Sequence, residues 1–364
     1  MFGVGSIAWA GEWDGRLHLQ LGPEADTNVH RLYDEKSAGA LLRLVLNGNF
    51  HYMTGNHDWN LGYEGGGKLF LEEGGENLLV NNVSGSYLWY GSERLSLGLR
   101  SSFQDHLQQD HGRDYQLLDL DGVISFRMLS WLDSELYAGG RAFRLRNGEE
   151  QAEGEIIASL LTSYAGPLCG LRLSASAWGG LVVSSYYQVE TRFTDAKALG
   201  RTPEGDLVLS KEERLDMLHV GGLGLRKKFA YRLRKYIILD AQYSLSFNDS
   251  NSENGMARWH RVRGMMAMQL PWSLSFYLMG TVQLRDRFVL SDAQGRLFEP
   301  DADENENSVV VRLTYSATER LHLLLQGSLY RNEFRPGDSA LEKGSFERET
   351  LMLAIAFDWF FRNE

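Results

Sequence analysis

The stretch Leu351-Met352-Leu353-Ala354-Ile355-Ala356-Phe357-Asp358-Trp359-Phe360-Phe361 alternates large apolar side chains with small or polar ones. Successive side chains of a strand point to opposite faces. One face carries Leu351, Leu353, Ile355, Phe357, Trp359 and Phe361, and the other carries Met352, Ala354, Ala356 and Asp358. The first face suits lipid and the second suits water. A lone strand cannot lie in hydrocarbon with unpaired amides, so a chain of such strands must close into a barrel.

The composition also favours a barrel. The 364 residues include 39 Gly, 16 Tyr, 17 Phe and 9 Trp but 6 Pro, a balance that suits bent sheets with aromatic girdles. No run approaches the ~20 apolar residues of a spanning helix, which excludes a helical membrane protein. The net charge of -11 argues against nucleic acid as a partner, because nucleic-acid binding needs a basic surface. The single cysteine, Cys169, excludes an intrachain disulfide, and we expect it in a short turn.

About sixteen segments share the strand pattern, an even number as single-chain bacterial barrels require. The predicted strands span residues 16–28, 41–52, 59–70, 78–90, 94–104, 115–128, 132–145, 153–164, 169–188, 215–226, 235–247, 259–270, 274–288, 308–316, 321–333 and 347–361. Short links such as Gly166-Pro167 and 229–231 alternate with longer polar links such as 193–214 and 289–307. Because these barrels alternate short periplasmic turns with longer outer loops, both termini are expected in the periplasm. The sequence predicts an all-β, antiparallel, up-and-down transmembrane barrel in the outer membrane of a Gram-negative bacterium.

The amino end has small residues at Ala8 and Ala10, as at the end of a secretory signal peptide. We expect residues 1–10 to be a remnant of such a signal, with the true start codon upstream. A short first strand or plug segment is the alternative. Residues 11–364 are then expected to form a single barrel domain.

Strand alternation assigns charged side chains to the lumen, because leucines occupy the opposite face of the same strands. The predicted lumen-lining arginines are Arg16, Arg43, Arg94, Arg100, Arg127, Arg141, Arg172, Arg261, Arg263, Arg285 and Arg312. The predicted lumen-lining acids are Glu64, Asp119, Asp121, Asp133, Glu135, Asp240 and Asp358. The lumen is therefore mixed but leans towards arginine, whereas acidic residues gather in the outer links around 204–213 and 299–306.

Two interpretations of the lumen arginines stay open. Guanidinium groups offer planar donors that suit carboxylates, phosphates and sugar hydroxyls, which favours an anionic or sugar-like passenger. The same arginines can instead pair with the inward acids in a structural wall network. The links 193–214 and 289–307 are long enough to fold into the lumen and constrict it.

No motif makes a convincing enzyme, and we expect no cofactor, metal or catalytic residue. The pairs Asp105-His106 and Asp110-His111 fall in a predicted outer loop, where a solvated loop is the default over a metal or a rim protease. Residues 301–307 resemble the start of a calcium loop, but they have Glu306 where glycine should turn the chain. Trp259 fits an interfacial aromatic girdle, as do Tyr87, Trp89, Tyr90, Trp359, Phe360 and Phe361.

Two short stretches resemble known barrel families. The run Glu24-Ala25-Asp26-Thr27-Asn28-Val29 is similar to a segment that begins many outer-membrane barrels linked to exopolysaccharide clusters and to porin-like families. The aromatic end at 357–361 is similar to the terminal strand that the barrel-assembly machinery recognises, although Arg362-Asn363-Glu364 follow it. The resemblance implies an exopolysaccharide-export porin, whose periplasmic helical-repeat scaffold would here be a separate partner.

The leading hypothesis is an outer-membrane channel for hydrophilic, anionic or sugar-like passengers, with the terminal porin of exopolysaccharide export as a specific form. The alternative is a non-transporting barrel that anchors a motility or secretion machine. The expected partners are outer-membrane lipid, lipopolysaccharide and the barrel-assembly machinery, with no nucleic acid.

Overall fold

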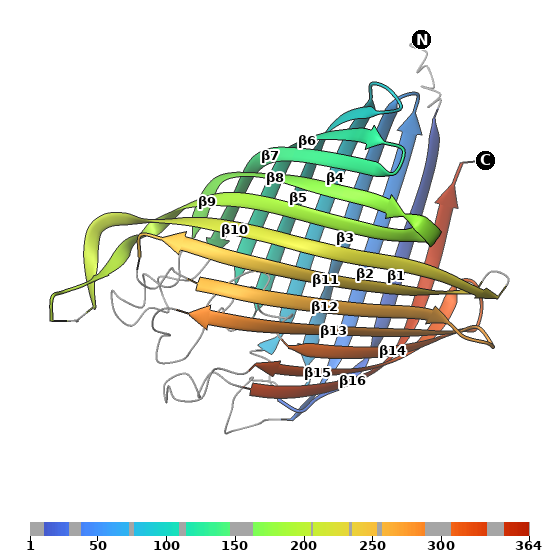
Figure 1. The fold of residues 1–364 in the computed structure, drawn as a ribbon. Helices are drawn as coiled ribbons and strands as arrows, with labels where there is room; N and C mark the ends of the chain where they lie inside the picture. The colour runs from blue at the N-terminus through green and yellow to red at the C-terminus, as the bar shows by residue number, and fades with distance from the viewer. Residues whose placement is uncertain are drawn as a thin grey trace, which may run out of the picture.

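The computed structural model describes residues 11–28, 38–72, 76–108, 114–145, 163–204, 207–232, 235–252, 257–287, 307–332 and 346–363. They form a closed barrel of sixteen antiparallel strands, in which each strand pairs with its sequence neighbours and β1 pairs with β16 (Figure 1). The predicted fold class is therefore confirmed. No helix in these residues is long and apolar enough to cross a membrane.

The strands follow one another around the barrel in chain order. Their bounds are β1 Glu12–Asp26, β2 Gly39–Thr54, β3 His57–Phe70, β4 Leu78–Tyr90, β5 Leu95–Gln108, β6 Tyr115–Leu129, β7 Leu132–Leu145, β8 Tyr164–Ala177, β9 Leu181–Arg201, β10 Leu207–Arg232, β11 Lys235–Ser250, β12 Ala257–Gln269, β13 Leu274–Arg287, β14 Ser308–Ser316, β15 Leu321–Asn332 and β16 Phe346–Arg362.

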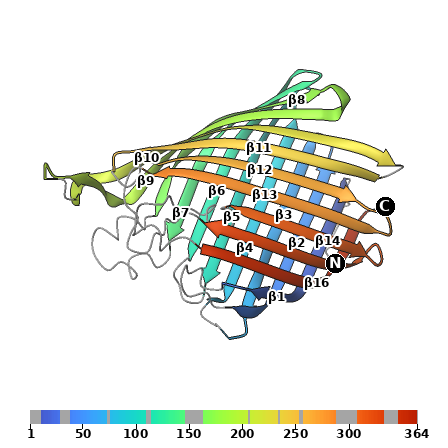
Figure 2. The same cartoon turned by 60° about the horizontal axis from the view of Figure 1, so that its bottom comes forward.

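The two ends of the barrel differ in their connections. At one end, which we call the short-turn end, two to four residues join consecutive strands, whereas five to twenty residues join them at the long-loop end. The N-terminal end of β1 and the C-terminal end of β16 both lie at the short-turn end. Asp14 pairs there with Arg362, and Glu12 pairs with Met53 beside the turn into β3. Figure 2 shows N and C on the same side of the barrel. The predicted alternation of short and long links is thus present.

Strand β16 shows how the sequence pattern shapes the wall. Its odd-numbered side chains point outwards and are exposed, with Leu353 at 59% and Ile355 at 47%. Its even-numbered side chains Met352, Ala354 and Ala356 point inwards and are at most 2% exposed, because they pack with Leu324 of β15. This part of the inner face is a dry apolar cluster rather than the water-facing surface that the alternation predicts.

Large apolar side chains lie on the outer face of every strand. Cross-strand register places side chains of the same face opposite each other around the ring. At least one large apolar side chain on each strand is exposed on this face, as in Leu21, Leu44, Leu61, Leu79, Leu99, Leu120, Leu136, Leu171, Tyr187, Leu223, Leu239, Val262, Leu284, Val309, Leu325 and Leu353. Such a continuous apolar band is stable only against lipid or another apolar medium.

The predicted strand boundaries between 153 and 188 are wrong. The chain forms β8 at 164–177 and β9 from 181, with a turn through Gly179 and Gly180 at φ of 69° and 75°. The pair Gly166-Pro167 lies inside β8 instead of forming a turn, at the point where the β8–β9 ladder skips two residues. Proline has no N–H to give to a ladder, so it occupies such an interruption. The segment 153–162 lies outside the described residues.

The link at 193–214 is not a loop. Strands β9 and β10 continue through it as a hairpin that extends beyond the neighbouring strands (Figure 1), so the prediction that this link folds into the lumen is wrong. A residue outside the β9–β10 hairpin also contacts it: the Leu199 N–H donates a hydrogen bond to Oγ of Ser252, just after β11, at 2.9 Å. At the other end of β10, residues 229–231 belong to the strand and not to a turn. The link at 288–306 lies outside the described residues, as do residues 1–10.

Cys169 lies in β8 rather than in a turn, and its side chain is exposed on the outer face. The turn prediction failed because the strand boundaries around it were displaced.

Candidate functional site

Most of the predicted lumen charges lie on the inner face as ion pairs. Cross-strand register places their side chains opposite one another, on the face that does not carry the exposed leucines. The pairs and their nitrogen–oxygen distances are Arg16–Asp358 at 3.0 Å, Arg43–Glu24 at 3.0 Å, Arg100–Glu135 at 2.9 Å, Arg127–Asp133 at 3.0 Å, Arg141–Asp119 at 2.6 Å, Arg172–Glu135 at 3.7 Å and Arg226–Asp240 at 2.8 Å. This arrangement corresponds to the wall network that was the alternative interpretation of the arginines.

Sequence reasoning missed several charges on the same face. Glu190 is fully buried and forms ion pairs with Arg141 at 3.0 Å and with Arg192 at 2.8 Å. Glu24 and Asp26 are also buried on the inner face. Alternation along β1 would have identified Glu24 and Asp26, whereas Glu190 lay beyond the predicted end of its strand.

Three predicted arginines that lie in strands differ from the ion-paired ones, because no carboxylate pairs with them among the residues that the structure describes. Arg261 on β12 donates from Nε to Gln283 Oε1 at 2.8 Å, and Arg312 on β14 donates from Nε to Gln326 Oε1 at 2.8 Å. Arg263 on β12 contacts a methionine sulfur at 3.1 Å. We call Arg261, Arg263 and Arg312 the arginine arc. In the described part of the structure, their neutral partners leave the positive charge of this part of the wall uncompensated.

The remaining predicted lumen residues are placed as follows. Arg94 lies in the turn before β5 and not in a strand. Asp121 faces Arg100 across the β5–β6 register, and its Oδ1 atom is buried without a hydrogen-bond partner in the described structure. Arg285 lies in β13, but its side chain is outside the described part. Glu64 is exposed on the inner face of β3.

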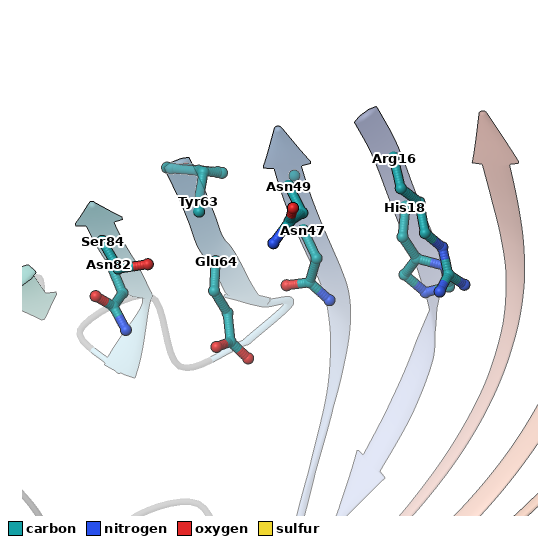
Figure 3. A pocket seen from close by; sticks show the side chains of 10 residues that line it. Arg16, His18, Asn47, Asn49, Tyr63, Glu64, Asn82 and Ser84 are labelled. Atoms are coloured by element: carbon teal, nitrogen blue, oxygen red, sulfur yellow. The ribbon is translucent and has the colours of Figure 1, made fainter. Parts of the chain in front are cut away.

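A hollow in the inner wall lies beside Glu64, at mid-height on β2, β3 and β4. Figure 3 shows Asn47 and Asn49 on β2, Glu64 on β3, and Asn82 and Ser84 on β4 around it. Its volume is about 530 Å³, within the range of roughly 300–1,000 Å³ that is typical of small-molecule sites. Besides these amide and hydroxyl groups, Arg16 and His18 of β1 line the hollow (Figure 3), where both side chains contact Asp358.

The Asp-His motif does not form a loop site. Asp105 and His106 lie in β5 and point to opposite faces, where Asp105 accepts a hydrogen bond from Gln116 at 3.1 Å and His106 stacks on Tyr115 with ring centroids 4.8 Å apart. The second pair, at 110–111, and residues 301–306 of the calcium-like run lie outside the described residues. Within the described ranges, no group of three or more His, Cys, Asp or Glu side chains is arranged to hold a metal ion.

The predicted aromatic girdle needs three corrections. Trp259 points inwards and is 8% exposed, as its shared parity with Arg261 requires. Tyr90 lies on the inner face, where its hydroxyl donates to Asp58 Oδ2 at 3.1 Å. Phe360 shares the inner face as well, under the guanidinium of Arg16 at 5.5 Å from the ring centroid. The girdle was predicted from residue type alone, whereas the position of each residue in the alternation of its strand decides whether its side chain points outwards or inwards.

The fold and its surfaces define a transmembrane antiparallel barrel with an apolar outer face and a largely polar inner face. No protein-family model matches the sequence, and no curated protein matches it. Solved structures resemble it weakly. The toluene transporter TodX of Pseudomonas putida has a TM-score of 0.39 at 8% identity, over 95% of this chain and 89% of that chain. OccK2 (OpdF) of Pseudomonas aeruginosa, solved in complex with glucuronate, has a TM-score of 0.46 at 11% identity, over 97% and 99%.

A bacterial polysaccharide outer membrane secretin has a TM-score of 0.41 at 9% identity, over 94% of this chain and 98% of that chain. At this level of similarity, the passengers of these proteins say nothing about the passenger of this chain. The chemistry of the inner wall is the basis for a functional proposal.

Proposed function

We propose that this protein is an outer-membrane channel for hydrophilic solutes, with a preference for anionic ones. The apolar outer band supports placement in a membrane, and strands are the only described elements available to cross it. The short-turn end, which carries both termini, would face the periplasm, as in bacterial barrels generally.

The arginine arc, which pairs with no carboxylate in the described part of the chain, is the observation that carries the anion preference. Paired arginines in the rest of the wall present little net charge, because each lies within 4 Å of a carboxylate. The arc arginines hydrogen-bond to glutamine oxygens or contact sulfur, so their charge is left to attract a solute. Side-chain charges in a barrel wall set ion selectivity because the solute passes close to them.

The test is the reversal potential of single channels in planar bilayers under a salt gradient. The variant Arg261→Glu/Arg263→Glu should shift the selectivity from anions towards cations. The matched control, Arg226→Gln/Asp240→Asn, removes an inner ion pair without a change in net charge and should leave the reversal potential unchanged. An equal shift in both variants, or no shift in the first, would contradict the role of the arc.

Export of an exopolysaccharide is a narrower form of this proposal, and the resemblance of the segment 24–29 motivates it. Glycosyltransferase and polysaccharide co-polymerase genes beside this one, and loss of secreted polymer after its deletion, are the expected observations. A barrel that conducts no ions in bilayers would instead favour the anchoring role. Secreted polymer at wild-type levels in the deletion strain would exclude the export role.

A further inference from the structure

The inner wall opposite Arg261 and Arg263 has a different chemistry. We call Asn47, Asn49, Asn82 and Ser84, together with Glu64 between them, the amide strip (Figure 3). Strands β4 and β12 stand eight places apart in the ring of sixteen, so the strip lies opposite Arg261 and Arg263, whereas Arg312 on β14 is four strands from β2. Figure 1 shows β2–β4 behind β11–β13. A solute in the lumen would therefore meet the amides on one side, with Arg16 and His18 of β1 beside them, and the guanidinium groups of Arg261 and Arg263 on the other.

The groups of the strip have few internal partners. Cross-strand register places Asn47 opposite Glu64 and Glu64 opposite Asn82, in one row across three strands. The Oδ1 atoms of Asn47 and Asn82 are buried and accept no hydrogen bond in the described structure. Buried polar atoms are normally satisfied, so an unpaired acceptor in a hollow indicates a ligand or water that would complete it. The last torsion of asparagine is broad, so each side chain can present its carbonyl or its amine to the lumen.

The hollow continues along the wall towards β5. A second hollow of about 400 Å³ shares Asn49, Gly62 and Ser84 with the first. A Cβ at Gly62 would lie 2.6 Å from Ser84 Oγ, so a larger residue there would force the serine hydroxyl to rotate away. The glycine thus allows the serine hydroxyl to lie over β3, and it adds no side-chain atoms that would fill the hollow. The two hollows together make an elongated polar groove rather than a single compact pocket.

We propose that the amide strip binds the hydroxyl groups of sugar rings as they pass through the lumen. A sugar hydroxyl both donates and accepts, which matches asparagine and serine, and a carboxylate such as Glu64 accepts from two neighbouring hydroxyls. A small anion gains less from this wall than a sugar ring does, because the Glu64 carboxylate lies within the strip and the nearby Arg16 already pairs with Asp358. The inference deepens the proposed channel function and rests on it, since it names a polyhydroxylated solute as the passenger class.

The test uses a neutral linear hexasaccharide of glucose as the probe. Isothermal titration calorimetry on the detergent-solubilised full chain should detect binding, and the sugar should cause transient blocks of single-channel current. Replacement of both amides, Asn47→Leu/Asn82→Leu, should weaken binding about 10-fold or more, because each lost hydrogen bond contributes about 1 kcal/mol. The matched control Gln242→Leu, a lumen-side amide on β11, should bind the sugar as the wild type does.

Absence of hexasaccharide binding to the wild-type chain would overturn the inference without any variant. Equal loss of binding in the double variant and in the Gln242→Leu control would overturn it as well. The calorimetric measurement needs no conduction, so it separates this inference from the channel proposal. A barrel that conducts ions but does not bind the hexasaccharide would support the proposed channel function and would contradict sugar binding at the amide strip.

Discussion

Arg16 and Asp358, 342 residues apart in the chain, meet across the seam where the last strand closes on the first. Arg16 donates from Nε at 3.1 Å and from Nη2 at 3.0 Å to Oδ1 of the carboxylate. His18 contacts the same Oδ1 at 2.9 Å, and His322 contacts Oδ2 at 2.9 Å. One carboxylate, whose side chain is 5% exposed, therefore joins β1, β16 and β15. We expect this cluster to stabilise the closed barrel.

The replacement Asp358→Ala should lower the free energy of unfolding by about 2–3 kcal/mol, the scale of hydrogen bonds to a charged group. The cost stays below that of a fully buried pair because Arg16 is 56% exposed and can be hydrated once its partner is gone. The measurement is urea unfolding in detergent micelles, followed by tryptophan fluorescence. A heat-modifiable shift on gels should confirm that the variant still closes.

The control for this replacement is Asp133→Ala. Its partner Arg127 lies 3.0 Å away, and both side chains are more than half exposed. Exposed pairs contribute about 0–1 kcal/mol, so this variant should unfold nearly as the wild type does. If Asp133→Ala destabilised the barrel as much as Asp358→Ala, the seam would have no special role.

The strand pattern made most of the fold predictable, since the apolar face of 351–361 and its repetition imply closure. The failures have a local cause at β8, where Gly166-Pro167 looked like a turn and the true turn used Gly179 and Gly180. The predicted strands 153–164 and 169–188 are both shifted relative to β8 and β9, but each still corresponds to one strand, so the predicted count of sixteen is unaffected.

The candidate site was less predictable. Alternation assigns a side to each charge, but it cannot say which charges find partners across strands. Arg141 pairs with Asp119, whereas Arg263 contacts the sulfur of a methionine, and nothing in either local sequence distinguishes the two arginines. The register between strands decides the pairing, and the register comes from the closed ring. The amide strip escaped notice because asparagine, serine and glycine form no charged pattern in sequence.

The two faces of β11 allow a direct test of sidedness. Ala241 points outwards and Gln242 points inwards, and both are exposed near the middle of the strand. Ala241→Arg should cost about 2–4 kcal/mol, because it places a charge in the lipid near the midplane, while Gln242→Arg should fold normally. The folded yield in vesicles and the urea midpoint give the comparison. Equal behaviour of the two variants would contradict the assignment of the faces.

The single cysteine reports on the same surface without a stability measurement. Cys169 lies on the outer face and should react in liposomes with a lipid-soluble maleimide but not with a charged, water-soluble thiol reagent. In a Cys169→Ser background, Ser84→Cys on the inner wall should react with the charged reagent. Labelling of Cys169 by the charged reagent in intact liposomes would show that β8 does not face lipid there.

The extended β9–β10 hairpin should depend on Ser252. The Ser252→Ala variant removes the Oγ acceptor of the Leu199 N–H in a site where Leu199 is 2% exposed, so the amide would lose its partner at a cost of about 1–3 kcal/mol. Hydrogen exchange at residues 196–201 should speed up by about 5-fold or more, since 1 kcal/mol corresponds to that ratio, while the barrel strands keep their protection. Ser210→Ala, which removes an exposed contact to the Glu212 N–H in the same hairpin, is the control and should leave this exchange unchanged. Unaltered exchange in Ser252→Ala would mean that the hairpin is held by its own ladder.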